Sequence, residues 1–185
     1  MMDNFGFMQN HSFSVSGGSE RTSYRMGLGY TGEDGILITD KDKFNRVNFS
    51  SFISVDVNKW LTTQLDVRYA NSNQYKVEQG GRNGVWGSAM ALPSYQNILP
   101  YEVDGITYPA ETSATYVRYG EPRNIKKTDM RVLGRVIISP LKGLKITGEY
   151  TYNRTTKYNK FYANKYQYVG FNFTGILNSV ENTIY

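Results

Sequence analysis

The chain has 185 residues, of which 15% are aromatic, and its 16 Tyr and 18 Gly suit strands joined by turns. It contains no Cys, which excludes a disulfide framework and thiolate metal sites. Its net charge of +5 comes from dispersed Lys and Arg, and no apolar run approaches the roughly 18 residues of a membrane helix. Neither nucleic-acid binding nor a helical membrane protein is therefore predicted.

The first predicted elements are two strands, over residues 10–17 and 23–31. In the first, Phe13 and Val15 alternate with serines, and in the second, apolar residues occupy the even positions from Tyr24 to Tyr30. An apolar residue at every second position places one apolar and one polar face on a strand. The short polar segment between the two strands predicts a hairpin turn.

Two further hairpins follow along the chain. Their strands are predicted over 46–57, 61–70, 129–138 and 144–153. Tight turns at 58–60 and 139–143 join the members of each pair. Phe52 is the one residue that breaks the alternation of its strand.

The lengths of strands and connections indicate a membrane barrel. Each strand has about 8 to 11 residues, enough for a tilted strand to cross a bilayer. The turns within hairpins are short, whereas the connections between hairpins, at 32–45, 72–128 and from 155 onward, are long. Short turns on one side and long loops on the other are typical of outer-membrane barrels. The sequence therefore predicts an all-β, antiparallel, up-and-down transmembrane β-barrel segment with long extracellular loops.

Aromatic residues occupy positions that suit the interface of a bilayer. Trp60 lies at a short turn, and Tyr30, Tyr69, Tyr150 and Tyr152 lie at the loop-side ends of the predicted apolar faces. Amphipathic rings favour the level of the lipid headgroups. The same alternation also fits a soluble secreted β-sandwich that binds carbohydrate, in which these rings pack the core and the surface. That fold remains the alternative interpretation.

Several phrases of the sequence resemble a known family. The phrases are NHSFSVSGGSERTSY at 10–24, GY at 29–30, EDGIL at 33–37 and NKWL at 58–61. Together they resemble the barrel of SusC/RagA-type TonB-dependent outer-membrane transporters. The resemblance covers residues 9–70 and, more loosely, 128–152, whereas 72–127 matches no motif.

The resemblance implies a fold, a location and partners. It implies a barrel of about 22 strands with a plugged lumen, energised through TonB and lidded by a SusD-like lipoprotein that helps to capture oligosaccharide or peptide nutrients. Residues 1–185 would then be a partial barrel domain of a larger protein, without the family's plug domain and N-terminal extension. The expected function is import of glycans or other large nutrients across the cell outer membrane, with lipid around the barrel.

No catalytic, cofactor-binding or metal-binding residues are predicted, and the chain is not expected to be an enzyme. His11 is the only histidine, which excludes a His-based triad or a multi-histidine metal site within the chain. The G-x-G-x-x-G match at 27–32 lies inside a predicted strand and does not open a helix, as a dinucleotide site requires. Glu33 and Asp34 are adjacent and lack the separated geometry of an acid–base pair.

Two sets of residues are candidates for contact with a solute or with a segment inside the barrel. Charged residues on the polar faces would line the lumen, and they are Arg25, Asp56, Asp66, Arg68, Arg131, Arg135, Lys145 and Glu149. Aromatic residues of the long connection could stack on sugar rings, and they are Trp86, Tyr95, Tyr101, Tyr108, Tyr116 and Tyr119. Packing of these aromatic residues into a lid over the barrel is the alternative explanation.

Overall fold

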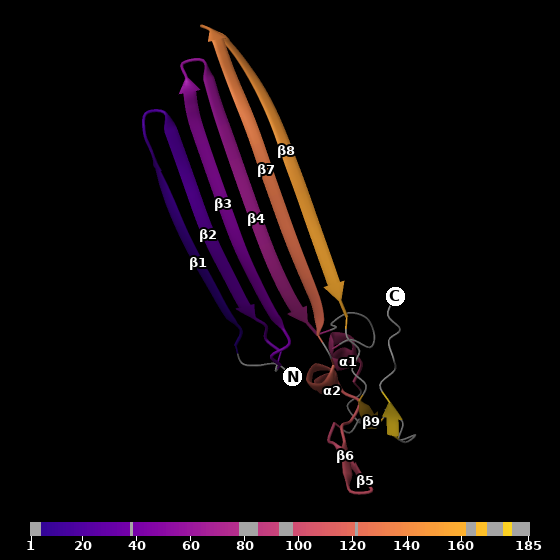
Figure 1. Cartoon of the computed structure of the whole chain (residues 1–185). Coiled ribbons are helices and arrows are strands. Elements are labelled where there is room, and N and C mark those ends of the chain that lie inside the picture. Colours follow the sequence, from indigo (N-terminus) through magenta and orange to yellow (C-terminus); the bar gives the residue numbers. More distant parts are fainter. Residues whose placement is uncertain are drawn as a thin grey trace.

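One antiparallel sheet of six long strands dominates the fold (Figure 1). The computed structural model describes residues 5–37, 39–77, 85–92, 98–120, 122–161, 166–169 and 176–178. The long strands are β1 (Phe7–Gly18), β2 (Thr22–Asp34), β3 (Lys43–Asn58), β4 (Leu61–Lys76), β7 (Arg123–Leu141) and β8 (Leu144–Lys160). Their order is β1-β2-β3-β4-β7-β8, so the described sheet is up-and-down, has open edges at β1 and β8, and is not closed into a barrel. The predicted antiparallel arrangement of about six strands is confirmed.

The observed strands are longer than the alternation predicted. β4 continues to Lys76 and β7 begins at Arg123, and these two residues still pair with each other. The prediction of a loop over 72–128 is therefore wrong at both ends. The physical reason is that segments 71–76 and 123–128 are mostly polar on both faces. Alternation disappears there, while the backbone hydrogen bonds that define a strand continue.

The three hairpin turns lie at one end of the sheet, and the longer connections lie at the other (Figure 1). The first turn closes with a hydrogen bond from Ser19 N to Thr22 O at 2.7 Å. In the second, the Asn58 side chain accepts a hydrogen bond from the backbone N–H of Trp60 at 3.0 Å. The third contains Gly143, whose φ of 90° is a conformation that favours glycine.

The register gives the sheet one polar and one apolar face. Residues paired across strands point to the same side of a sheet, and Phe49 pairs with Tyr69, which in turn pairs with Met130. In the described chain no second layer covers either face, and Tyr150 is 74% exposed. Leu133 is the only buried hydrophobic residue in the six described strands.

A second region, here called the cap, lies at the end of the sheet opposite the hairpin turns (Figure 1). The cap comprises α1 (Val85–Ala91), β5 (Tyr101–Val103), β6 (Ile106–Tyr108), α2 (Ser113–Tyr119) and β9 (Gln167–Val169), with residues 35–37 and 39–42 of the β2–β3 connection. A further short strand, β10 (Ile176–Asn178), pairs with β9. Among the described residues, no helix has the length and apolar character needed to span a membrane.

The cap contains a small core that comes from distant parts of the chain. Leu37, Val77, Val85 and Val117 are buried together, and Val85 has no exposed surface. Apolar side chains from the β2–β3 connection, the end of β4 and both helices thus meet in one cluster. Burial of this kind stabilises a fold in water, because it removes apolar surface from solvent.

Polar contacts connect the parts of the cap. Val169 forms a parallel bridge with Ala110, so the segment that follows β8 pairs with the segment that precedes α2. Lys41 Nζ donates to the carbonyl of Gly120 at 3.0 Å, at the C-terminal end of α2. A cation at this position complements the free carbonyls of a helix end.

Candidate functional site

The eight predicted lumen residues all lie on the polar face of the sheet. On β3 and β4 this face consists of even-numbered residues, and on β2, β7 and β8 it consists of odd-numbered residues, as the pairings of Arg25 with Phe52 and of Phe52 with Asp66 show. Leu133 completes this row on β7, opposite Asp66. Phe52, Leu133 and Ile137 are therefore apolar residues on a face that is otherwise mainly polar or charged.

A row of hydrogen bonds crosses this face over four strands. Gln64 Nε2 donates to Ser54 Oγ at 3.3 Å, and Gln64 Oε1 accepts from Arg135 Nη1 at 3.2 Å. Arg135 also pairs with Glu149, with Nε and Nη2 at 2.8 and 2.7 Å from Oε2. The row joins β3, β4, β7 and β8. Arg135 and Glu149, which are two of the predicted lumen residues, therefore connect strands as well as line the surface of the sheet.

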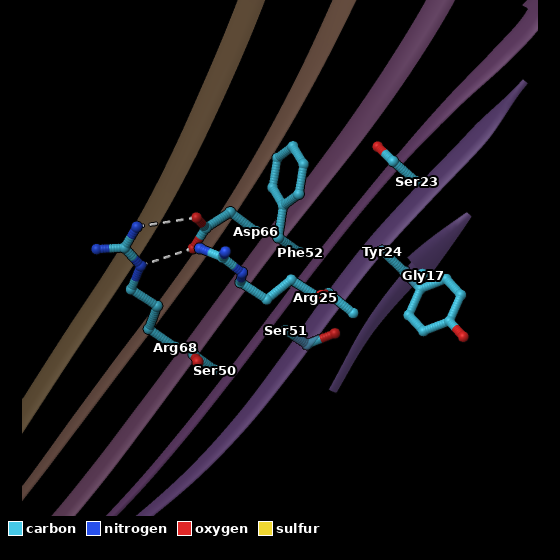
Figure 2. Close-up of a pocket in the computed structure, with 10 residues that line it drawn as sticks. Gly17, Ser23, Tyr24, Arg25, Ser50, Ser51, Phe52, Asp66 and Arg68 are labelled. Atoms are coloured by element: carbon cyan, nitrogen blue, oxygen red, sulfur yellow. Dashed lines mark hydrogen bonds and ion pairs between the residues drawn. The ribbon is translucent and has the colours of Figure 1, made fainter. Parts of the chain in front are cut away.

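A hollow of about 920 Å³ lies over β1 to β4, and Figure 2 shows residues that line it. Arg68 holds Asp66 through two hydrogen bonds, Nε to Oδ1 at 2.9 Å and Nη2 to Oδ2 at 3.0 Å. In Figure 2 the Arg25 side chain points toward this pair, whereas the Tyr24 ring lies away from it. The hollow offers the Phe52 ring beside charged groups, a combination that suits contact with an amphipathic partner such as a sugar or a packed protein segment.

The remaining predicted lumen residues occupy different heights on the same face. Asp56 accepts a hydrogen bond from Thr62 at 2.6 Å near the β3–β4 turn. Lys145 lies near the β7–β8 turn and is exposed. Arg131 is also exposed and lies directly opposite Arg68. The face therefore carries both signs of charge along its length.

The candidate aromatic residues of the long connection fall into separate groups. Trp86 and Tyr116 pack against the buried core of the cap. Tyr101 and Tyr108 lie opposite each other in the β5–β6 hairpin. Tyr95 lies outside the described residues. Trp86 and Tyr116 therefore have a packing role in the cap.

Tyr119 belongs to a cluster that includes two tyrosines beyond the long connection. Its ring stacks on Tyr166 with centroids 5.5 Å apart, and the Tyr166 and Tyr168 centroids are 5.9 Å apart. Burial, with a contribution from the charge of Glu111, raises the pKa of Tyr116 to about 12 and also raises the pKa of Tyr168. The cap thus favours the neutral phenol form of Tyr116 and Tyr168.

The sequence contains a signal for one cap element that the alternation did not identify. Asp104 and Gly105 have positive φ values of 51° and 76° and form the tight turn between β5 and β6. An Asp-Gly pair between residues of high strand propensity is a strong hairpin signal. By contrast, Tyr166 and Tyr168 had no local signal, because their neighbours come from a segment more than 40 residues earlier in the chain.

The described residues contain no group of three or more His, Cys, Asp or Glu side chains that could hold a metal ion. Comparison of the chain with protein-family models and with curated proteins finds no match.

Proposed function

We propose that this chain is a segment of an outer-membrane β-barrel in a TonB-dependent importer of the SusC/RagA kind, which takes up glycans or other large nutrients. The observation that carries the membrane part of this proposal is the apolar band. This name denotes the apolar-face rows from Leu61 and Ile138 at the turn end to Tyr69 and Met130 toward the cap.

The apolar band ends at nearly the same height on neighbouring strands. Beyond Tyr69 and Met130 the next pair on this face is Asn71 with Thr128, and the pair after that is Asn73 with Lys126. A boundary shared by separate strands is expected where a sheet passes from hydrocarbon into water. A core covered by protein does not require such a level boundary.

The height of the apolar band fits a bilayer. It spans Leu61–Tyr69 on β4, which corresponds to roughly 30 Å along the strand at about 3.3 Å per residue. A strand tilt of about 40° reduces the height to about 23 Å, close to the roughly 25 Å apolar band of outer-membrane barrels. β4 and β7 continue past the band with mostly polar residues on both faces, as expected for strands that project into water.

Aromatic residues support this placement in part. Trp60 is 49% exposed at the turn end, and Tyr69 lies at the margin nearer the cap. On β8 the last apolar residues of this face are Tyr150 and Tyr152, which pair with Gly134 and Val132, and Arg154 follows opposite Met130. Although β8 continues to Lys160, its apolar face ends at Tyr152, one row nearer to the turns than Met130 on β7.

The open edges and the polar face support a place within a larger barrel. β1 and β8 each have one unpaired edge in the described chain, and unpaired strand edges are costly in lipid. Further strands at both edges would satisfy these groups and enclose the polar face as a water-filled lumen. The family assignment, and with it TonB and a SusD-like lipoprotein as partners, depends on the resemblance at residues 10–24, which form the β1–β2 hairpin.

A pair of matched substitutions tests the membrane placement. Val136 lies on the apolar face and is 41% exposed, and Thr147 lies on the polar face at nearly the same height on the adjacent strand. In the protein expressed from its whole reading frame and folded into lipid vesicles, we expect Val136→Arg to lower the free energy of unfolding by about 2 to 4 kcal/mol. Thr147→Arg should change it by less than about 1 kcal/mol, because its side chain reaches water.

If Val136→Arg and Thr147→Arg changed the free energy of unfolding equally, the membrane placement would be contradicted. The transport function has a separate test, in which the gene is deleted and growth is measured on individual glycans as sole carbon source. Loss of growth on one of them, restored by the wild-type gene and not by a gene lacking β7 and β8, is the expected result. Unchanged growth and uptake on all tested nutrients would remove the importer assignment.

A further inference from the structure

Three arginines line a second hollow on the polar face, nearer to the cap than the first. This hollow has a volume of about 380 Å³, and Arg46, Arg68 and Arg131 contribute to its lining from β3, β4 and β7. Ala70, with its short side chain, also lines the hollow and leaves space between the longer side chains. Among the described residues that line it, Asp129 is the only carboxylate.

The charges around this hollow are not balanced. Asp129 is already engaged, since its Oδ2 lies 2.8 Å from Lys127 Nζ and its Oδ1 accepts from Thr155 at 2.7 Å. Arg68 lies directly opposite Arg131 in the register. Like charges that are directly opposed across strands repel each other, unless an anion lies between them.

The guanidinium groups retain donors for such an anion. Asp66 bonds only Nε and Nη2 of Arg68, which leaves Nη1 available. Arg46 donates through Nε to Asn48 at 2.8 Å. A planar guanidinium carries five N–H donors in a fork that matches a carboxylate. An approaching carboxylate could therefore be bonded by more than one arginine.

We propose that this hollow binds a carboxylate group, and that the preferred bearer is an acidic oligosaccharide. The sugar is favoured because Asn48, Asn153 and Thr155 also line the hollow and offer amide and hydroxyl groups to its hydroxyls. This inference depends on the proposed function, which places the hollow in a water-filled lumen. The same chemistry could also be supplied by an acidic side chain of a protein segment inside the barrel.

The test uses the protein expressed from its whole reading frame and purified in detergent, with trigalacturonate as the acidic probe and maltotriose as the neutral one. Calorimetric titration should show tighter binding of trigalacturonate, weakened by added salt. Arg131→Gln should weaken this binding about tenfold, which is the usual effect of losing a hydrogen bond to a charged group. Lys142→Gln, which removes one positive charge at the remote β7–β8 turn, should change it less than about twofold.

A second variant guards against simple misfolding. Arg131→Lys keeps the charge but loses the planar fork of donors. We expect its affinity for trigalacturonate to lie between the affinities of the wild type and of Arg131→Gln. If trigalacturonate does not bind, but Arg131→Gln lowers the melting temperature clearly more than Lys142→Gln does, the carboxylate is an internal side chain and the site is still supported.

The absence of both effects would overturn the carboxylate site. Should Val136→Arg and Thr147→Arg nevertheless differ in vesicles as expected above, the proposed membrane function would stand and only this site would be lost. The two hypotheses can therefore fail separately.

Discussion

The sheet and the cap place their apolar side chains in opposite environments. In the cap, Val85 is 0% exposed and Leu37 is 3% exposed, because side chains from several segments of the chain cover them. In the sheet, Phe13 is 68% and Tyr150 is 74% exposed, because no described element covers either face. The cap thus covers its apolar side chains with its own segments, whereas the described residues leave the apolar face of the sheet uncovered.

The two regions also differ in how their backbone groups are satisfied. The cap uses short elements whose ends are covered by local contacts, such as the Thr112 hydroxyl that accepts from Thr115 N at 3.3 Å. The sheet relies on long ladders of hydrogen bonds, which leave the outer edges of β1 and β8 open. An open edge beside an exposed apolar face favours association with other chains.

The largest effect is expected when residues 1–185 are expressed alone. Without further strands or lipid, the open edges and the apolar band are exposed together, so we expect inclusion bodies and no stable monomer in the absence of detergent. Fractionation of the lysate and size-exclusion chromatography measure this. A soluble monomer with one cooperative melting transition would contradict the membrane placement and favour the β-sandwich.

The same truncation should have different effects in the two regions. Val85→Ala removes two methyl-sized groups from the buried cluster of the cap, and we expect it to lower the free energy of unfolding by about 2 kcal/mol. Val136→Ala should lower it by less than about 1 kcal/mol in vesicles, since lipid fills the space that the side chain leaves. Denaturant titration of the full-length protein in vesicles measures the free energy of unfolding of both variants. Equal effects would mean that protein, and not lipid, covers Val136.

Alkaline pH should weaken the cap more than the sheet. The pKa of Tyr116 is raised from 10.0 to about 12 in the folded cap, mainly by burial. Between these two pH values the unfolded chain releases a proton that the folded chain retains. The stabilisation from the buried phenol is therefore fully present below about pH 10 and is lost as the pH rises toward 12.

Tyrosinate absorbance combined with melting curves checks this pH dependence. Tyr116→Phe should make the stability of the cap depend less on pH in this window, because phenylalanine has no proton to release. Tyr158→Phe, which changes a tyrosine on β8 that is 55% exposed, is the matched control and should leave the slope unchanged. A slope that is the same in all three proteins would show that Tyr116 is not held as a neutral phenol by the fold.

The smallest effect is expected for the ion pair on the polar face. The Arg135 and Glu149 side chains are 39% and 40% exposed, so solvent screens their attraction. A double-mutant cycle with Arg135→Gln and Glu149→Gln should give a coupling energy of about 0.5 kcal/mol. A value several times larger would indicate that this row of hydrogen bonds is shielded from water, as it would be under a tightly packed internal segment.

Local patterns in the sequence were sufficient to identify the six long strands and their faces. Alternation around Phe13, Leu65 and Val136 correctly indicated which residues share a face, because the side-chain period of a strand is a property of neighbouring residues. The short turns could be located for the same reason, since Asn58 and Gly143 act within a few residues. The ends of the strands could not be located in this way, because segments that are polar on both faces show no alternation.

Only the tertiary structure decided how these local elements combine. The level margin of the apolar band depends on pairs such as Tyr69 with Met130, which are distant in sequence and are brought together by the strand register. The core of the cap joins Leu37, Val85 and Val117 by long-range packing that no short pattern encodes. Alternation thus determined the two faces of each strand, and pairing and packing between distant segments determined the band, the hollow lined by three arginines and the buried cluster.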